Sequence, residues 1–152
     1  ILDVDYHHGN GTQAIFYERA DVPFASIHGH PEQEYPFFLG YDDEHGAGPG
    51  EGANRNYPMR HGSGWDVYEP ALADAIAFLQ GHRPDALVVS LGVDTYKGDP
   101  ISKFRLDHEH YLRIGEMIGA MGRPTLVVFE GGYAVDEIGI NAVNVLEALA
   151  SS

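Results

Sequence analysis

The sequence predicts an α/β fold in which a parallel β-sheet is flanked by helices. Short runs rich in Val, Ile and Leu recur along the chain, and two of them contain the Val-Val pairs typical of strands buried on both faces. Segments with helical spacing of apolar residues lie between and after these runs. Strands that alternate with helices form α/β sheets, whose ligands gather at the carboxyl ends of the strands.

Four apolar runs are expected to form the strands. They comprise residues 1–4, 23–27, 86–91 and 125–129. The first run starts at Ile1, with no preceding residues to supply the neighbours that a buried strand needs. With 152 residues and 43% hydrophobic content there is material for one core. We therefore expect residues 1–152 to be the C-terminal part of a single domain.

Three segments have the apolar periodicity of helices. In residues 65–79 the apolar side chains recur on one face until Gly81 ends the run. A second helix is expected to begin after an Asp107 cap and to stop before Gly122. A third covers residues 135–150.

The segment between Gly40 and Gly64 is rich in residues that interrupt regular structure. It contains seven glycines together with Pro49 and Pro58. No regular element is expected there, and the stretch is too long for a simple turn. We interpret it as a functional loop.

Composition limits the partners. A net charge of -14 repels a phosphate backbone, so no nucleic acid is expected. The acidity either favours cationic ligands or serves solubility alone. No cysteine is present, so a metal must be bound by His and carboxylates, and the cytoplasm is the expected compartment. No apolar run reaches the roughly 20 residues of a membrane span. The oligomeric state is left open, a homo-oligomer included.

Polar side chains follow the predicted strands at their carboxyl ends. Alternation sends Asp3, Asp5 and His7 to one side, so that Asp5 and His7 can converge on one ion while Asp3 supports them. Taken alone, this group fits a solvated strand end equally well. Asp94 ends a neighbouring strand and offers a third ligand, and a catalytic zinc site has three protein ligands and one open position.

The fourth predicted strand leads into Gly131, Gly132 and Tyr133. The glycines allow close approach of the backbone to a ligand, and the tyrosine hydroxyl can donate to an oxyanion. A tyrosine at such a place more often only packs, but three strand ends agree here. Asp99, which precedes Pro100, is interpreted as a turn former and not as a ligand.

Four motifs, in this order, resemble the histone deacetylase and acetylpolyamine amidohydrolase superfamily: DVDYHHGNGTQ, SIHGHP with YPFF, SLGVDTYKGDP and FEGGY. The resemblance covers nearly the whole chain, and YPFFLG and EGGY are more similar to bacterial acetylpolyamine amidohydrolases. It implies a sheet of the arginase-deacetylase type. It also implies a zinc-dependent hydrolase that removes acetyl groups from a cationic acetylated small-molecule amine such as acetylpolyamine, or from acetyl-lysine.

The resemblance further implies the roles of individual residues. Asp5, His7 and Asp94 become zinc ligands, and Tyr133 becomes the tyrosine that stabilises the transition state.

A tunnel for the acylated amine is also implied. Phe37 or Phe38 would line it, Ile101 would lie at its rim, and Gly131 and Gly132 would border it.

A potassium ion is implied near Asp3 and Ser26. The related arginases bind two manganese ions with two further aspartates, whose positions are Gly9 and Tyr96 here. A single zinc ion is therefore expected.

One departure from the family bears on activity. Family members carry a histidine pair, acting as general base and acid, some tens of residues before the first ligand motif, and here only four residues precede Asp5. Two hypotheses follow. The sequence is part of a deacetylase, or it is a non-catalytic metal-binding fragment or interaction module that lacks the pair.

Overall fold

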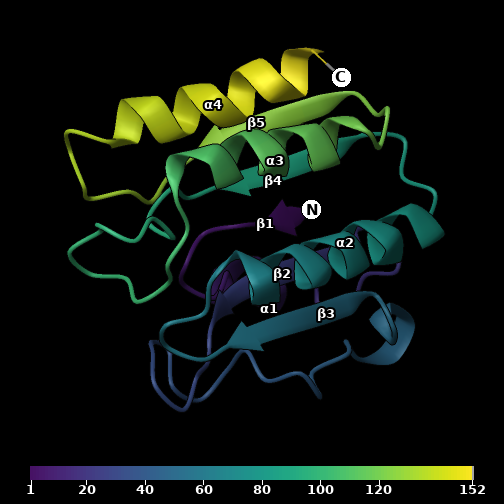
Figure 1. Ribbon diagram of the computed structural model, residues 1–152. Helices are drawn as coiled ribbons and strands as arrows, with labels where there is room; N and C mark the ends of the chain where they lie inside the picture. The colour runs from purple at the N-terminus through teal and green to yellow at the C-terminus, as the bar shows by residue number, and fades with distance from the viewer. Residues whose placement is uncertain (152) are drawn as a thin grey trace.

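A parallel sheet organises the computed structural model, which describes residues 1–151 (Figure 1). The strands pair in the order β3-β2-β1-β4-β5, and every pair is parallel. Their bounds are β1 Leu2–Asp3, β2 Phe24–Gly29, β3 Asn54–Met59, β4 Leu87–Leu91 and β5 Thr125–Phe129. The predicted parallel α/β architecture is confirmed.

The helices include the three expected ones. They are α1 Asn10–Phe16, α2 Trp65–Gly81, α3 His108–Gly119 and α4 Ile138–Ser151, with a short 3-10 helix η1 at Gly48–Gly50. Asp107 caps α3 as predicted, since its carboxylate accepts a hydrogen bond from His108 N at 2.9 Å. Helix α1 was not expected, because its buried residue is the polar Gln13 and its sequence has no apolar stripe.

The direction of the chain along the sheet decides which face each helix covers. The chain runs from β1 to β2 one way, and from β3 to β4 and on to β5 the other way. Right-handed crossovers then place α1 on one face and α2 and α3 on the other, which is the near face in Figure 1. On that face α2 packs against β1, β2 and β3, and α3 packs against α4.

Strand β5 is covered by other elements on one face, and the side chains on its other face are exposed. Leu126 and Val128 are exposed, while Val127 between them points to the other face and packs against the core. Parallel strands are normally covered on both faces, and β1 and β2 follow that rule. The expectation of a fully buried strand at residues 125–129 is therefore right for one face only.

The expectation of no regular element between Gly40 and Gly64 is wrong, because β3 lies in this segment. Two features hid the strand. At the edge of the sheet, Pro58 is tolerated because an edge strand has one unpaired side. The inward residues Asn54 and Asn56 are buried against polar partners, so the sequence shows no alternation of apolar residues.

Candidate metal centre

The candidate site lies where the order of the sheet reverses. Strands β1 and β4 are neighbours, and the chain proceeds from them toward opposite edges. Ligands of open α/β sheets bind in the crevice at the carboxyl ends of such a strand pair. Asp5 and His7 follow β1 and Asp94 follows β4, so the topology itself brings these distant segments together.

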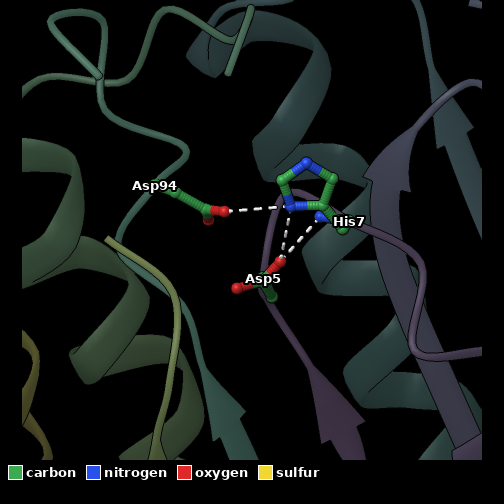
Figure 2. A group of neighbouring side chains, drawn as sticks. All are labelled: Asp5, His7 and Asp94. Carbon is green, nitrogen blue, oxygen red and sulfur yellow. Dashed lines mark hydrogen bonds and ion pairs between the residues drawn. The ribbon is translucent and has the colours of Figure 1, made fainter. Parts of the chain in front are cut away.

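Figure 2 shows the three side chains around a common point. His7 Nδ1 lies 3.3 Å from Asp5 Oδ1 and 3.2 Å from Asp94 Oδ2. One ligand atom from each residue falls within 4.8 Å of the other two. Asp5 and Asp94 are buried and His7 is partly exposed, so the group opens toward solvent on one side.

Backbone contacts hold these carboxylates in place. Asp5 Oδ1 accepts from His7 N at 2.7 Å, and Asp94 Oδ1 accepts from Tyr6 N at 2.9 Å. Asp3 supports the first contact as expected, since its Oδ1 accepts from Asp5 N at 3.1 Å. Among residues 1–151, the buried Asp94 Oδ2 makes no hydrogen bond, and it forms an ion pair with His7 Nδ1. A buried carboxylate oxygen without a hydrogen bond is the arrangement that a cation satisfies.

Two glycines permit the close packing of the ligands. A Cβ atom on Gly92 or on Gly131 would lie 2.1 Å from Asp5 Oδ2. Gly131, predicted to border a tunnel, thus lies directly against the carboxylates. Gly132 has φ +146, and an added Cβ would meet Val93 at 2.7 Å. Its backbone conformation is one that residues with a side chain rarely adopt.

The electrostatics of the site fit a missing positive charge. The carboxylates of Asp5 and Asp94 close to Nδ1 raise the pKa of His7 to about 10, so the imidazole is protonated between them. Burial is the main cause of the raised pKa of Asp94, and burial followed by Glu130 raises that of Asp3. A divalent cation would replace the proton of His7 and balance the acidic cluster more fully.

Tyr133 is brought to the same site by the loop after β5. Its pKa is raised, first by burial and then by Asp94 and Asp5, so the phenol keeps its proton at neutral pH. The side chain is 48% exposed. It is therefore a hydrogen-bond donor at the open side of the ligand group.

A cavity of about 650 Å³ is lined by Tyr133 together with Asp5 and His7, while Asp94 lies outside its lining. Its wall includes Asp3, Asp5, His7 and Gly131, and it adds Tyr35, which the sequence did not single out. The signal was present in YPFF, but it did not indicate which aromatic ring faces inward.

Other residues predicted for the site lie elsewhere. Neither Phe37 nor Phe38 is among the residues that line the cavity, and both are exposed. Ile101 is likewise outside the lining and 44% exposed. Ser26 is buried and bonds His28 Nδ1 at 2.8 Å. The tunnel and potassium assignments of these residues stay predictions.

The chain is similar in sequence and fold to known proteins. The family model of the histone deacetylase domain matches residues 1–149. Acetylpolyamine amidohydrolase 1 of Pseudomonas aeruginosa is 69% identical over 147 residues, which are 97% of this chain and 42% of that protein. The acetylpolyamine amidohydrolase of Mycoplana ramosa is 54% identical over 150 residues, covering 99% of this chain and 44% of that protein.

A solved structure shows the same fold. The crystal structure of an acetylpolyamine aminohydrolase from Burkholderia pseudomallei superposes with a TM-score of 0.96 at 45% identity, covering 99% of this chain and 44% of that one. The chain thus spans less than half the length of these relatives. In the part that the structure describes, no helix combines the length and the apolar character needed to cross a bilayer.

Proposed function

The chain belongs to the histone deacetylase family, and from that membership we propose that it forms the metal-binding part of an amidohydrolase active site. The reaction is removal of acetyl groups from acetylated amines, with acetylpolyamine as the first candidate and acetyl-lysine as the second. The observation that carries the proposal is the convergence of Asp5, His7 and Asp94, two of which, Asp5 and His7, line a cavity whose wall also contains Tyr133.

Zinc is the proposed metal, with Asp5, His7 and Asp94 as its ligands. One imidazole nitrogen and two carboxylate oxygens match a catalytic zinc site with an open fourth position. When bound there, zinc supplies polarisation of the amide carbonyl and lowers the pKa of a bound water toward about 7.

Tyr133 has a separate role in the proposal. Its protonated hydroxyl donates a hydrogen bond to the oxyanion that forms when the amide carbonyl is attacked. Removing one such donor costs roughly 100- to 1,000-fold in kcat. The raised pKa of Tyr133 supports this role because the donor must stay neutral.

The lining of the cavity supports a cationic, partly aliphatic substrate. Asp3 and Glu130 make the wall acidic, while Tyr35 and Tyr133 offer aromatic surfaces. An acetylated polyamine combines methylene groups with a free ammonium group, which suits aromatic and acidic walls together. The charge of -14 favours the same substrate class through long-range attraction.

The reaction also requires a base for the water and an acid for the leaving amine. His7 is assigned to the metal, and His8 Nε2 bonds Gln13 at 2.9 Å while burial lowers the pKa of His8. His8 Nδ1 has no hydrogen-bond partner among residues 1–151, but it is buried, so we assign no proton transfer to either imidazole. An intact gene product with a further histidine pair would complete the site, and a product without one would bind metal and turn over nothing, which is the alternative function.

The test uses the intact gene product loaded with zinc. We expect hydrolysis of acetylputrescine and, more slowly, of an acetyl-lysine reporter. A folded, zinc-loaded protein that hydrolyses neither would favour the non-catalytic alternative. Zinc content of Asp5→Ala checks the ligand set separately, and a variant that kept stoichiometric zinc would refute it.

A further inference from the structure

We propose that Asp99 is a positioning residue for Tyr133, acting through the main chain. The inference rests on the proposed function, in which Tyr133 donates to the oxyanion. The sequence marks Asp99 only as a turn former before Pro100. In the structure the carboxylate of Asp99 has a second contact. One oxygen accepts hydrogen bonds within the turn, and the other accepts from Tyr133 N, 34 residues further along the chain.

The contacts of Asp99 join the loops that follow β4 and β5. Its Oδ1 accepts from Ile101 N at 3.0 Å and from Ser102 N at 3.3 Å, which forms the local turn. Its Oδ2 accepts from Tyr133 N at 2.8 Å. The residue is 7% exposed, and among residues 1–151 no cation pairs with it. Three main-chain donors thus stabilise a buried carboxylate.

The chemistry of this contact requires a carboxylate. An ionised carboxylate accepts hydrogen bonds on both oxygens, whereas an asparagine amide has one acceptor and one donor. In Asp99→Asn either the turn or Tyr133 N would face an NH₂ group. We call the contacts of Asp99 with the turn (Ile101 N and Ser102 N) and with Tyr133 N the bridge. The variant keeps the size of the side chain and removes one side of the bridge.

Tyr133 needs such a contact because little else holds it. The residue before it, Gly132, has φ +146, and its conformational freedom makes this part of the loop easy to deform. Among the described residues the Tyr133 hydroxyl has no hydrogen-bond partner, and the side chain is half exposed. Before Gly132, the carbonyl of Gly131 accepts a hydrogen bond from Val93 N at 2.7 Å. After Gly132, the amide of Tyr133 donates to Asp99.

The bridge also fixes the distance between Tyr133 and the metal ligands. Asp99 and Asp94 belong to one loop, and Asp94 is itself bound to Tyr6 N. Movement of Tyr133 relative to Asp99 is therefore movement relative to the metal. A misplacement of about 1 Å costs roughly 100-fold in rate when the displaced group acts on the reacting atoms.

Kinetics of the intact, zinc-loaded gene product test the proposal. We expect Asp99→Asn to lower kcat about 10- to 100-fold and to leave KM within about twofold. In a Tyr133→Phe background the same substitution should change kcat less than about twofold, because the hydroxyl that it positions is gone. An undiminished loss in that background would overturn the proposal. Asp107→Asn is the control, since it makes the same chemical change without contact to Tyr133.

Amide hydrogen exchange gives a readout that does not depend on turnover. Asp99→Asn should speed exchange of the Tyr133 amide about tenfold, the factor expected for loss of one charge-assisted hydrogen bond, and leave β4 and β5 unchanged. Unchanged exchange at Tyr133 would overturn the proposal. If wild-type protein turns over no acetylated amine, the proposed function fails while this measurement still decides the positioning role.

Asp99→Ser covers the case in which the asparagine variant does not fold. A serine hydroxyl can accept from residues 101 and 102, but it is too short to reach Tyr133. The turn is kept and only the bridge is lost. We expect the same kinetic and exchange effects as for Asp99→Asn, and wild-type values for both would overturn the proposal.

Discussion

Gly131→Ala should damage the metal centre without touching a ligand. The added Cβ would lie 2.1 Å from Asp5 Oδ2 and 2.9 Å from Asp94 Oδ2. Real Cβ contacts essentially never fall under 3.0 Å, so the closer carboxylate must retreat by about 0.9 Å. Metal sites tolerate ligand displacements of only about 0.2 Å. The substitution therefore separates ligand atoms whose identity is unchanged.

Zinc affinity is the quantity to measure, by competition with a chromogenic chelator. We expect a loss of at least about 10-fold for Gly131→Ala, the range seen when groups that orient ligands are removed. Gly139→Ala is the matched control, because no atom lies within 4 Å of its added Cβ and alanine favours a helix. Wild-type zinc affinity in Gly131→Ala would show that the loop absorbs the methyl group and would refute the reasoning.

Four further outcomes are expected. Chelation should lower the Tm of the zinc-loaded protein and zinc should restore it, as seen by calorimetry. Leu72→Ala should cost about 2–5 kcal/mol in urea unfolding, because Leu72 is fully buried in the core. Asp107→Ala should cost about 1 kcal/mol at pH 7. The pKa of Asp107 is lowered by Lys97 and His108 N, so this difference should begin to shrink as pH falls below about 4 and vanish only as pH passes through the lowered pKa. Tyr35→Ala should raise KM for acetylputrescine roughly tenfold, and a larger rise from Phe37→Ala would instead support the assignment from sequence.

The convergence of Asp5, His7 and Asp94 was predictable because each residue follows a strand that the sequence shows as an apolar run. Asp5 and His7 share one strand end, so their convergence needs only alternation. The joining of Asp94 to them needs the neighbouring strand, which the α/β pattern supplies. Strand β3 and helix α1 were not predicted, because the side chains that they bury are polar. Asn54 and Asn56 of β3 donate hydrogen bonds to Gln13 of α1, so neither element shows a periodic pattern of apolar residues.

Tyr35 and Asp99 show a second limit. YPFF presents aromatic residues almost side by side, and the backbone decides which of them faces the cavity. Phe37 adopts φ +67, a left-handed conformation that no periodicity rule anticipates. The local turn at Asp99 is visible in the sequence, whereas its bond to Tyr133 depends on how two loops meet in three dimensions.

The position of β1 has a consequence for the folding pathway. The shortest strand lies at the centre of the sheet, and the contact between Tyr6 N and Asp94 Oδ1 joins residues 88 positions apart. Closing a loop of that length costs about 4 kcal/mol in chain entropy, and contacts of such long range slow folding. The ligand set is complete only after β4 has joined β1. Zinc is therefore expected to bind after the slow step of folding and to report, in a stopped-flow experiment with a zinc indicator, when the native topology is reached.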